Sequence, residues 1–347
     1  MIFWIVFILI MLLCFAPINF GGISHSSLRR NLGYTIIIFI TIFRFDVGFD
    51  YIGYFQNIYP IFDYQSYNRL EPFGKMAMNI SHYYNNPQLF FILYGIVTFT
   101  CLLFVFTKYS KNIFLSIFFY LAFFYLPGLS TIRQEAAVFI TFAGYYFIKR
   151  NKPLVYLLIC LLASLFHSSA LIAIFFYPFL KINKIKNTII SALAIIAFMG
   201  ILMKIILSIP TFAAYYHYIE DAESYKGGSM IRYLYLLVSI LLFILSLTKY
   251  QNELTKLSLL SLIGCSISFI LGGHIGGRIA EYFTIYLCIG ISNILACNYK
   301  KYIMPVGISL SLLFLANIYI SMKNPTKSPY TPYKSVLFVD IKNPKFK

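Results

Sequence analysis

Polar residues that could do chemistry are concentrated where long apolar stretches begin or end. The first group is Arg44, Asp46, Asp50, Tyr51, Tyr54 and Glu71. Gly48 allows a sharp turn within it, and Tyr51 and Tyr54 lie one helical turn apart, so their rings could stack on a sugar. The arginine and the acids could instead pair with one another in a loop at a membrane surface. Spacing alone leaves both interpretations open.

A second group, Ser130 to Glu135, stands at an expected helix start. Ser130 is a candidate N-cap, and Arg133 would then project from the first turn, beside free backbone N–H groups and Gln134. An arginine at a helix N-terminus binds phosphate well. The alternative is a capped helix in which Glu135 neutralises Arg133.

Glycine-rich backbone precedes two further arginines, Arg232 and Arg278, and Tyr282 lies one turn after Arg278. Each is a weak signal alone. Together with Arg44 and Arg133, they place four arginines on one expected face, where they need anionic partners. Nearby acids supply some of these partners, and a lipid-linked pyrophosphate would supply the rest.

His167 interrupts a strongly apolar stretch and is followed by Ser168 and Ser169. A histidine at membrane depth is costly, and it usually faces a polar cavity. Its ordinary pKa near 6.5 suits proton transfer. The alternative is a structural histidine bonded to Ser168 or to a backbone carbonyl.

No HExxH, P-loop, GxGxxG or DxD motif is present, and the six cysteines show no CxxC spacing. We therefore expect no metal and no cofactor. Five of the cysteines lie inside apolar runs and the sixth at the end of one, where small apolar packing residues are expected.

These groups are carried by a chain of 347 residues that is 60% hydrophobic and only 11% charged. Soluble domains carry roughly 25% charged residues, so the composition predicts an all-α polytopic membrane protein that forms a single integral membrane domain, 1–347. The apolar runs are 2–20, 32–43, 88–107, 113–127, 135–148, 154–166, 168–180, 188–207, 230–248, 255–272, 279–297 and 303–322. They predict about 12 (11–13) transmembrane helices. The first run lacks a basic segment and a clear cleavage site, so we expect a retained helix.

The net charge of +17 comes from short basic clusters between apolar runs, which argues against nucleic acid as a partner. If these clusters are cytoplasmic, two crossings must separate Lys152 from Lys181. A helix pair would then break near residue 167, facing outward. The same topology gives outer loops at 44–87 and 208–229 and places most acids outside. It also places the basic C-terminal tail, 323–347, outside.

The polar groups together resemble the EpsG family of bacterial polysaccharide polymerases, related to the Wzy-type O-antigen polymerases. The matching elements, in order, are Arg44…Gly48-Phe-Asp50-Tyr51…Tyr54, Glu71-Pro72, Ser130…Arg133-Gln134, Phe166-His167-Ser168-Ser169, Arg278…Tyr282-Phe283 and Pro332-Tyr333. The Arg-Gln and His-Ser-Ser elements are the most specific.

The resemblance implies a GT-C-like fold and an enzyme of the bacterial cytoplasmic (inner) membrane, with its active site on the outer, periplasmic face. It would join oligosaccharide repeat units carried on undecaprenyl pyrophosphate into O-antigen, capsule or exopolysaccharide. Its partners would be that lipid-linked oligosaccharide, membrane lipids and a chain-length regulator. The rival functions are a flippase for the same units, a membrane acyltransferase that modifies the glycan, and a ligase.

In this hypothesis each candidate residue has a role. The candidate bases are His167, Asp50 and Glu71. The pyrophosphate ligands are Arg44, Arg133, Arg232 and Arg278. The remaining substrate contacts are Tyr51, Tyr54, Gln134, Ser168, Tyr282 and Tyr333.

Overall fold

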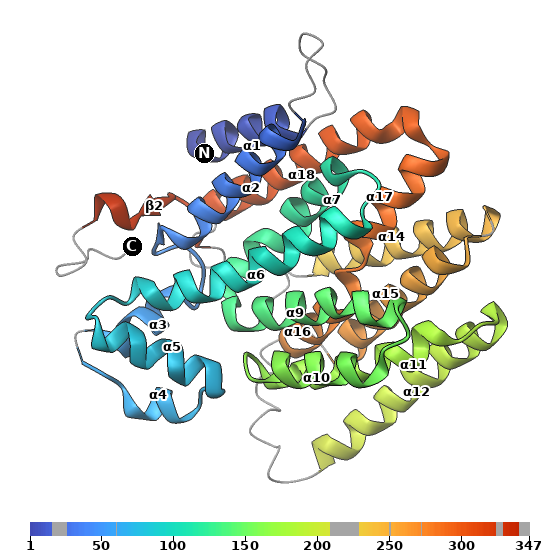
Figure 1. Ribbon diagram of the computed structural model, residues 1–347, viewed down its shortest axis with the longest axis horizontal. Helices are drawn as coiled ribbons and strands as arrows, with labels where there is room; N and C mark the ends of the chain where they lie inside the picture. The colour runs from blue at the N-terminus through green and yellow to red at the C-terminus, as the bar shows by residue number, and fades with distance from the viewer. Residues whose placement is uncertain are drawn as a thin grey trace.

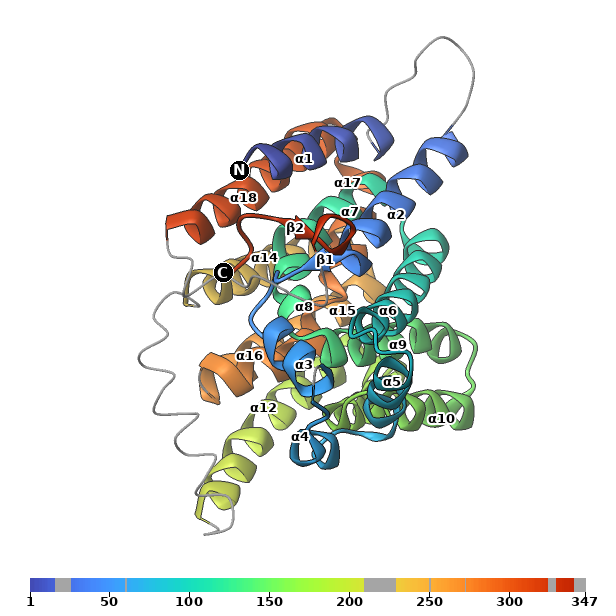
Figure 2. The same cartoon turned by 90° about the vertical axis from the view of Figure 1, so that its left-hand side faces the viewer.

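The computed structural model is a bundle of helices, seen from two directions in Figures 1 and 2. It describes residues 1–15, 26–59, 61–208, 229–249, 251–271, 273–323 and 329–339. The α-helices are α1 Ile2–Phe15, α2 Ser26–Ile42, α3 Tyr51–Ile58, α4 Tyr64–Asn68, α5 Pro72–Tyr83, α6 Gln88–Tyr109, α7 Ile113–Tyr120, α8 Leu126–Ser130, α9 Ile132–Lys149, α10 Pro153–Ser164, α11 Phe176–Lys181, α12 Ile185–Ser208, α14 Ser229–Thr248, α15 Asn252–Ile270, α16 Gly273–Thr284, α17 Leu287–Asn298 and α18 Ile303–Lys323. The other elements are a π-helix η1 Leu121–Tyr125, the 3₁₀ helices η2 Ser168–Phe175, η5 Lys300–Tyr302 and η6 Val336–Phe338, and the strands β1 Arg44–Phe45 and β2 Lys334–Ser335.

Among the described residues, five segments are long and apolar enough to cross a membrane: Gln88–Tyr109, Ile113–Ser130, Asn252–Ile270, Gly276–Asn298 and Lys300–Lys323. Helices suit this solvent because they satisfy every backbone polar group internally. The nearly all-α prediction is confirmed, with one two-stranded ladder as the exception. About twelve crossings and a GT-C-like fold remain predictions.

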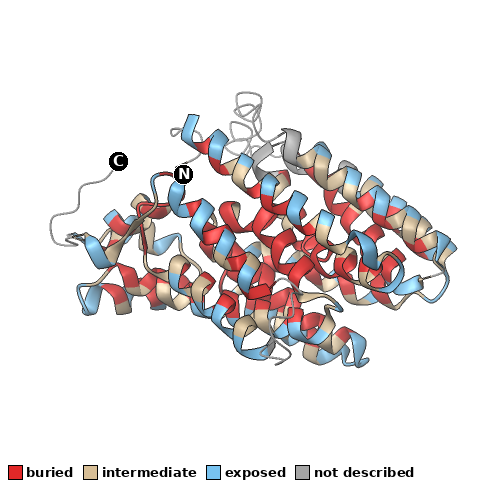
Figure 3. Ribbon diagram, turned by 90° about the horizontal axis from the view of Figure 1, so that it is seen from above, coloured by how far each residue is buried: buried red, intermediate tan, exposed pale blue. Residues whose placement is uncertain are grey.

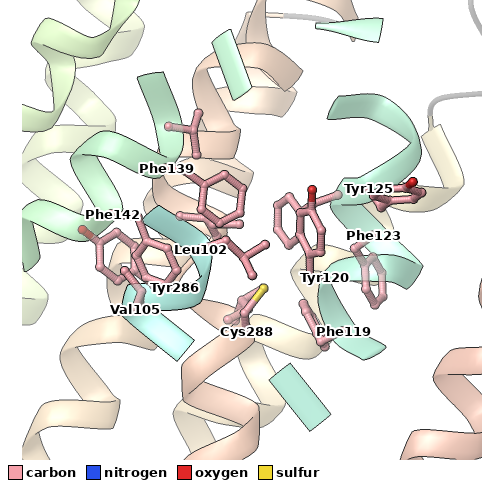
Figure 4. Close-up of a cluster of buried hydrophobic side chains, with 14 of the residues drawn as sticks. Leu102, Val105, Phe119, Tyr120, Phe123, Tyr125, Phe139, Phe142, Tyr286 and Cys288 are labelled. Atoms are coloured by element: carbon pink, nitrogen blue, oxygen red, sulfur yellow. The ribbon is translucent and has the colours of Figure 1, made fainter. Parts of the chain in front are cut away.

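Aromatic side chains fill the centre of the bundle. In the cluster shown in Figure 4, Tyr120 of α7 packs on Phe139 of α9 with ring centroids 5.5 Å apart. Phe142 of α9 packs on Tyr286, next to α17, at 4.9 Å. Both pairs meet edge to face, which is a favourable geometry for aromatic rings. They tie the helix that carries Arg133 to the middle of the bundle.

Peripheral helices turn apolar side chains outward, as the exposed bands in Figure 3 illustrate. Leu9 of α1 is 54% exposed, Leu193 of α12 is 63% exposed and Leu312 of α18 is 61% exposed. Lipid tails are as apolar as leucine, so such a surface costs nothing in a bilayer. This pattern fits a multi-pass membrane protein.

Residues 329–339 meet the first two helices at one end of the bundle. In the antiparallel pair β1–β2, Arg44 stands opposite Ser335, and Figure 2 shows this ladder beside α2. Trp4 Nε1 donates to the carbonyl of Tyr330 at 3.2 Å, and the Tyr333 hydroxyl donates to the carbonyl of Ile40 at 2.8 Å. Residues 329–339 therefore lie against the first two helices, on the side where segment 44–87 leaves α2.

Segment 44–87 contains three short helices, α3, α4 and α5, which Figure 1 shows grouped at one side of the bundle. Its entry depends on Gly48, which has φ 101°. A Cβ atom there would lie 2.6 Å from the carbonyl oxygen of Leu129, so only glycine fits without displacement. The expected loop 208–229 falls almost wholly outside the described residues, as do 324–328 and 340–347 of the tail.

The expected break near residue 167 is present. Helix α10 ends at Ser164, and the 3₁₀ helix η2 begins at Ser168. His167 stands between them with an extended backbone and is the N-cap of η2. The chain therefore changes direction at His167, close to the polar end of α9.

Candidate functional site

Glu71 connects two of the predicted groups. Its Oε2 accepts a hydrogen bond from Arg133 Nη1 at the start of α9. Its Oε1 accepts from the backbone N–H of Ser168 at 3.3 Å. Glu71 is also the N-cap residue of α5, although its side chain does not cap the helix. The carboxylate thus brings segment 44–87, α9 and the break at His167 into one cluster.

Arg133 also reaches the first tyrosine helix. Its Nε donates to the Tyr54 hydroxyl at 2.7 Å, and its guanidinium lies 5.6 Å from the centre of the Tyr54 ring. The side chain remains 21% exposed. The guanidinium is therefore positioned by two hydrogen bonds while part of it stays accessible.

Two residues near Arg133, Glu135 and Ser130, do not make the contacts that the sequence predicts for them. Glu135 is not its partner, because it is buried at 4% exposed. It lies so close to Gly128 that a Cβ atom on that residue would be 2.7 Å from Glu135 Oε1. Ser130 is not the N-cap of α9. Thr131 holds that position without a side-chain cap, and the Ser130 hydroxyl accepts from the backbone N–H of Phe49 at 3.0 Å.

Gln134 fastens α16 to α9. Its Nε2 donates to the carbonyl of Arg278 at 2.7 Å and to Glu281 Oε2, also at 2.7 Å. Arg278 Nη2 in turn lies 3.9 Å from Asp50 Oδ2, and the two side chains are 35% and 37% exposed. Because Arg133 and Gln134 are adjacent, a single helix start fixes the positions of both arginines.

His167 belongs to a chain of hydroxyl groups. Its Nδ1 lies 2.6 Å from Ser169 Oγ, which lies 3.0 Å from the Tyr282 hydroxyl. Nδ1 also accepts from the backbone N–H of Ser169 at 3.4 Å. Burial lowers the pKa of His167 to about 4, with Glu71 opposing this shift and Arg133 and Arg278 adding to it. The imidazole is therefore neutral at neutral pH, and its contacts make Nδ1 the nitrogen without a proton.

Arg44 is 1% exposed and binds backbone. Its Nε donates to the carbonyl of Val47 at 3.1 Å, its Nη1 to that of Thr41 at 3.1 Å and its Nη2 to that of Leu129 at 2.8 Å. A pyrophosphate could reach this guanidinium only by displacing these carbonyls. The geometry favours a structural role in which Arg44 ties β1 to the end of α8.

This role makes Arg44→Met a stability variant. Removing the guanidinium leaves three buried carbonyls without a donor, so we expect a loss of roughly 3 kcal/mol of stability. The readout is the melting temperature of the detergent-solubilised protein. Lys108→Met, which changes an exposed lysine at the C-terminal end of α6, is the control. An unchanged melting temperature of folded Arg44→Met would contradict the structural role.

The remaining predicted residues lie outside the central cluster or within its packing. Tyr51 is fully buried: its hydroxyl donates to Gln88 Oε1 at 2.9 Å and its ring stacks on Phe91 at 4.3 Å, so it cannot stack on a sugar in this conformation. Tyr333 stacks on Phe3 at 4.0 Å and anchors the tail. Arg232 Nη1 donates to the carbonyl of Ser268 at 3.5 Å, at the end of α15.

Two cluster residues were not selected from the sequence. Ser169, rather than Ser168, brings its hydroxyl to His167, whereas Ser168 contributes its backbone N–H. Glu281 binds Gln134 and so helps to fix Arg278. The sequence signal for each is its position alone. Ser169 belongs to the His-Ser-Ser element, and Glu281 lies next to Tyr282.

The described residues contain no group of three or more His, Cys, Asp or Glu side chains placed to hold a metal ion. The cluster consists of two partly exposed arginines, three carboxylates, a neutral histidine and hydroxyl groups at one end of a helical bundle. Such a set can bind an anion and transfer a proton.

The fold and this cluster define a multi-pass membrane protein with a charged site at one end of its helices. The chain belongs to the EpsG family, whose sequence model matches residues 30–335. At the level of the family, this makes it a membrane protein of polysaccharide biosynthesis, akin to glycosyltransferase-like polysaccharide polymerases of the Wzy type. Comparisons with curated proteins and with solved structures gave no match.

Proposed function

We propose that this protein joins oligosaccharide repeat units carried on undecaprenyl pyrophosphate, on the outer leaflet of the bacterial cytoplasmic membrane. One observation carries the proposal. Glu71 connects Arg133 to the break at His167, so an anion-binding group and a proton acceptor face the same place. A transfer that releases a pyrophosphate and deprotonates a hydroxyl needs both.

Arg133 and Arg278 are the proposed pyrophosphate ligands. Both are partly exposed and both are held beside a carboxylate. Arginine presents several N–H donors to phosphate oxygens and remains charged at any accessible pH. As the bond between the sugar and the lipid pyrophosphate breaks, negative charge grows on the departing oxygen, and fixed guanidinium groups stabilise it.

His167 is the proposed proton acceptor. The acceptor hydroxyl attacks the anomeric carbon of the growing chain, a new C–O bond forms, and the bond to the pyrophosphate oxygen breaks. The hydroxyl proton passes through Ser169 Oγ to Nδ1 of His167, along the contact of 2.6 Å. Tyr282 holds the serine hydroxyl in place. Asp50 and Glu71 are the competing bases, but each already faces an arginine.

The distribution of charge favours this function over its rivals. A flippase should place polar groups along a path that reaches both leaflets, whereas the connected residues of this cluster lie at one end of α9 and α16. A glycan acyltransferase would also require an acyl donor at the histidine.

The test is a gel of surface polysaccharide from a deletion strain. If the protein is a polymerase, the deletion strain should carry only a single repeat unit on its carrier. The wild-type gene should then restore the ladder of polysaccharide chain lengths. Loss of even the single repeat would point to a flippase or to an earlier step. An intact ladder with altered decoration would point to the acyltransferase.

The pH dependence of the reaction should reflect the protonation of His167. Because burial holds its pKa at about 4, the neutral form predominates above that pH and is lost below it. Polymerisation in proteoliposomes should therefore stay level from neutral pH down to about pH 5 and fall near pH 4. A fall centred near 6.5, the pKa of a solvated histidine, would show that His167 is not the buried base.

A further inference from the structure

A second polar cavity lies at the opposite end of the bundle from the candidate site. Its volume is about 300 Å³. It lies between the ends of α9 and α11 and the start of α15. Its polar lining residues are Tyr145, Lys149, Lys181, Asn183, Asn252, Glu253 and Lys256. Arg133 and Lys149 are at the two ends of α9, and 16 residues of helix span roughly 24 Å. The cavity is therefore separate from the cluster around Glu71.

The charges around this cavity do not balance. Three lysines and one glutamate line it, so their formal sum is +3 − 1 = +2. Glu253 is already shared, because Lys149 Nζ lies 2.6 Å from its Oε2 and the Tyr145 hydroxyl donates to its Oε1. Lys256 Nζ donates to the carbonyl of Leu180 at 3.0 Å, a neutral partner. Lys181 and Lys256 therefore bring positive charge to the cavity that Glu253 does not neutralise.

Additional donors point to an anionic ligand. The cavity includes Asn252, the first residue of α15, and the first turn of a 19-residue helix offers free N–H groups and a positive dipole end. Asn183 adds an amide. Basic pockets between helices at a membrane surface are known to hold lipid phosphate groups, and about 300 Å³ matches the smaller ligand pockets of proteins.

We propose that this cavity binds a phosphate group, with Lys181 and Lys256 as its principal contacts. The phosphate comes either from the headgroup of an anionic phospholipid or from a soluble phosphorylated molecule. The proposal is independent of the polymerase assignment, since none of its residues belongs to the cluster around Glu71.

The test measures ligand binding to the purified full-length protein. In one arm the protein is held in phosphatidylcholine nanodiscs with increasing phosphatidylglycerol, and bound lipid is counted by native mass spectrometry. In the other arm inorganic phosphate is titrated in detergent and thermal stabilisation is followed. Saturable binding in the first arm alone assigns a lipid headgroup, and saturable binding in the second assigns a soluble phosphate.

Substitutions around the cavity test both the direction and the size of the expected change in phosphate binding. The double variant Lys181→Gln/Lys256→Gln should weaken binding about 30-fold, from about fivefold for each lysine near a membrane surface. Lys300→Gln, an exposed lysine outside the cavity, should leave binding unchanged. Glu253→Gln should strengthen binding, because it raises the formal charge to +3. Absence of saturable binding in both arms, or equal weakening by Lys300→Gln, would overturn the proposal.

Discussion

Arg133→Ala is expected to abolish the polysaccharide ladder while the protein stays in the membrane at its normal level. Arg133 faces Glu71 and Tyr54 from the first turn of α9. Losing one fixed donor to a developing oxyanion typically costs about 100- to 1,000-fold in rate. The alanine also leaves the Glu71 carboxylate without its cation in a partly buried site, so the loss should fall at the upper end of this range.

The measurement is chain-length analysis in the complemented deletion strain, with membrane protein quantified beside it. Arg133→Lys should retain partial activity, because it keeps the charge but not the two-directional hydrogen bonding of a guanidinium. Arg150→Ala, at the other end of α9, is the matched control and should give a normal ladder. A normal chain length in Arg133→Ala would remove Arg133 from the pyrophosphate role.

Much of the cluster could be predicted because polar residues stand out in an apolar chain. His167 stands out because a histidine costs free energy inside a membrane unless it is used. Arg133 and Gln134 stand out because they lie at an expected helix start, where an arginine binds phosphate well. The structure brings all three to one end of the bundle. The break at His167 followed from counting crossings between basic clusters. Both predictions require only that the chain lies in a membrane and the pattern of charged and apolar residues along it.

The pairings could not be predicted because they depend on long-range packing. Glu71 rather than Glu135 faces Arg133, since Glu135 points into the bundle beside Gly128. Arg44 resembled the other arginines in sequence. Its guanidinium nevertheless reaches Leu129, a contact that exists only because Gly48 lets the two segments approach closely. The charge of each side chain can be read from the sequence, whereas its partner depends on how distant segments pack together.

His167→Gln is the variant that tests the base directly. Glutamine is polar and of comparable size but cannot take a proton, so substrate binding should persist while turnover falls about 100- to 10,000-fold, the usual contribution of a general base. In proteoliposomes with purified lipid-linked repeat units, the expected change is in kcat with KM nearly unchanged. The acid limb near pH 4 should vanish from the residual activity, because its titrating group is gone.

A matched histidine separates chemistry from packing. His82, in α5, has Nδ1 3.3 Å from the carbonyl of Ile58, and His82→Gln should leave both kcat and the acid limb as they are. Ser169→Ala should lower kcat as well, because it removes the hydroxyl between the acceptor and Nδ1. If His167→Gln were fully active, the base would be a carboxylate. Asp50→Asn and Glu71→Gln would then have different effects on turnover. The variant that stopped turnover without loss of substrate binding would identify the base.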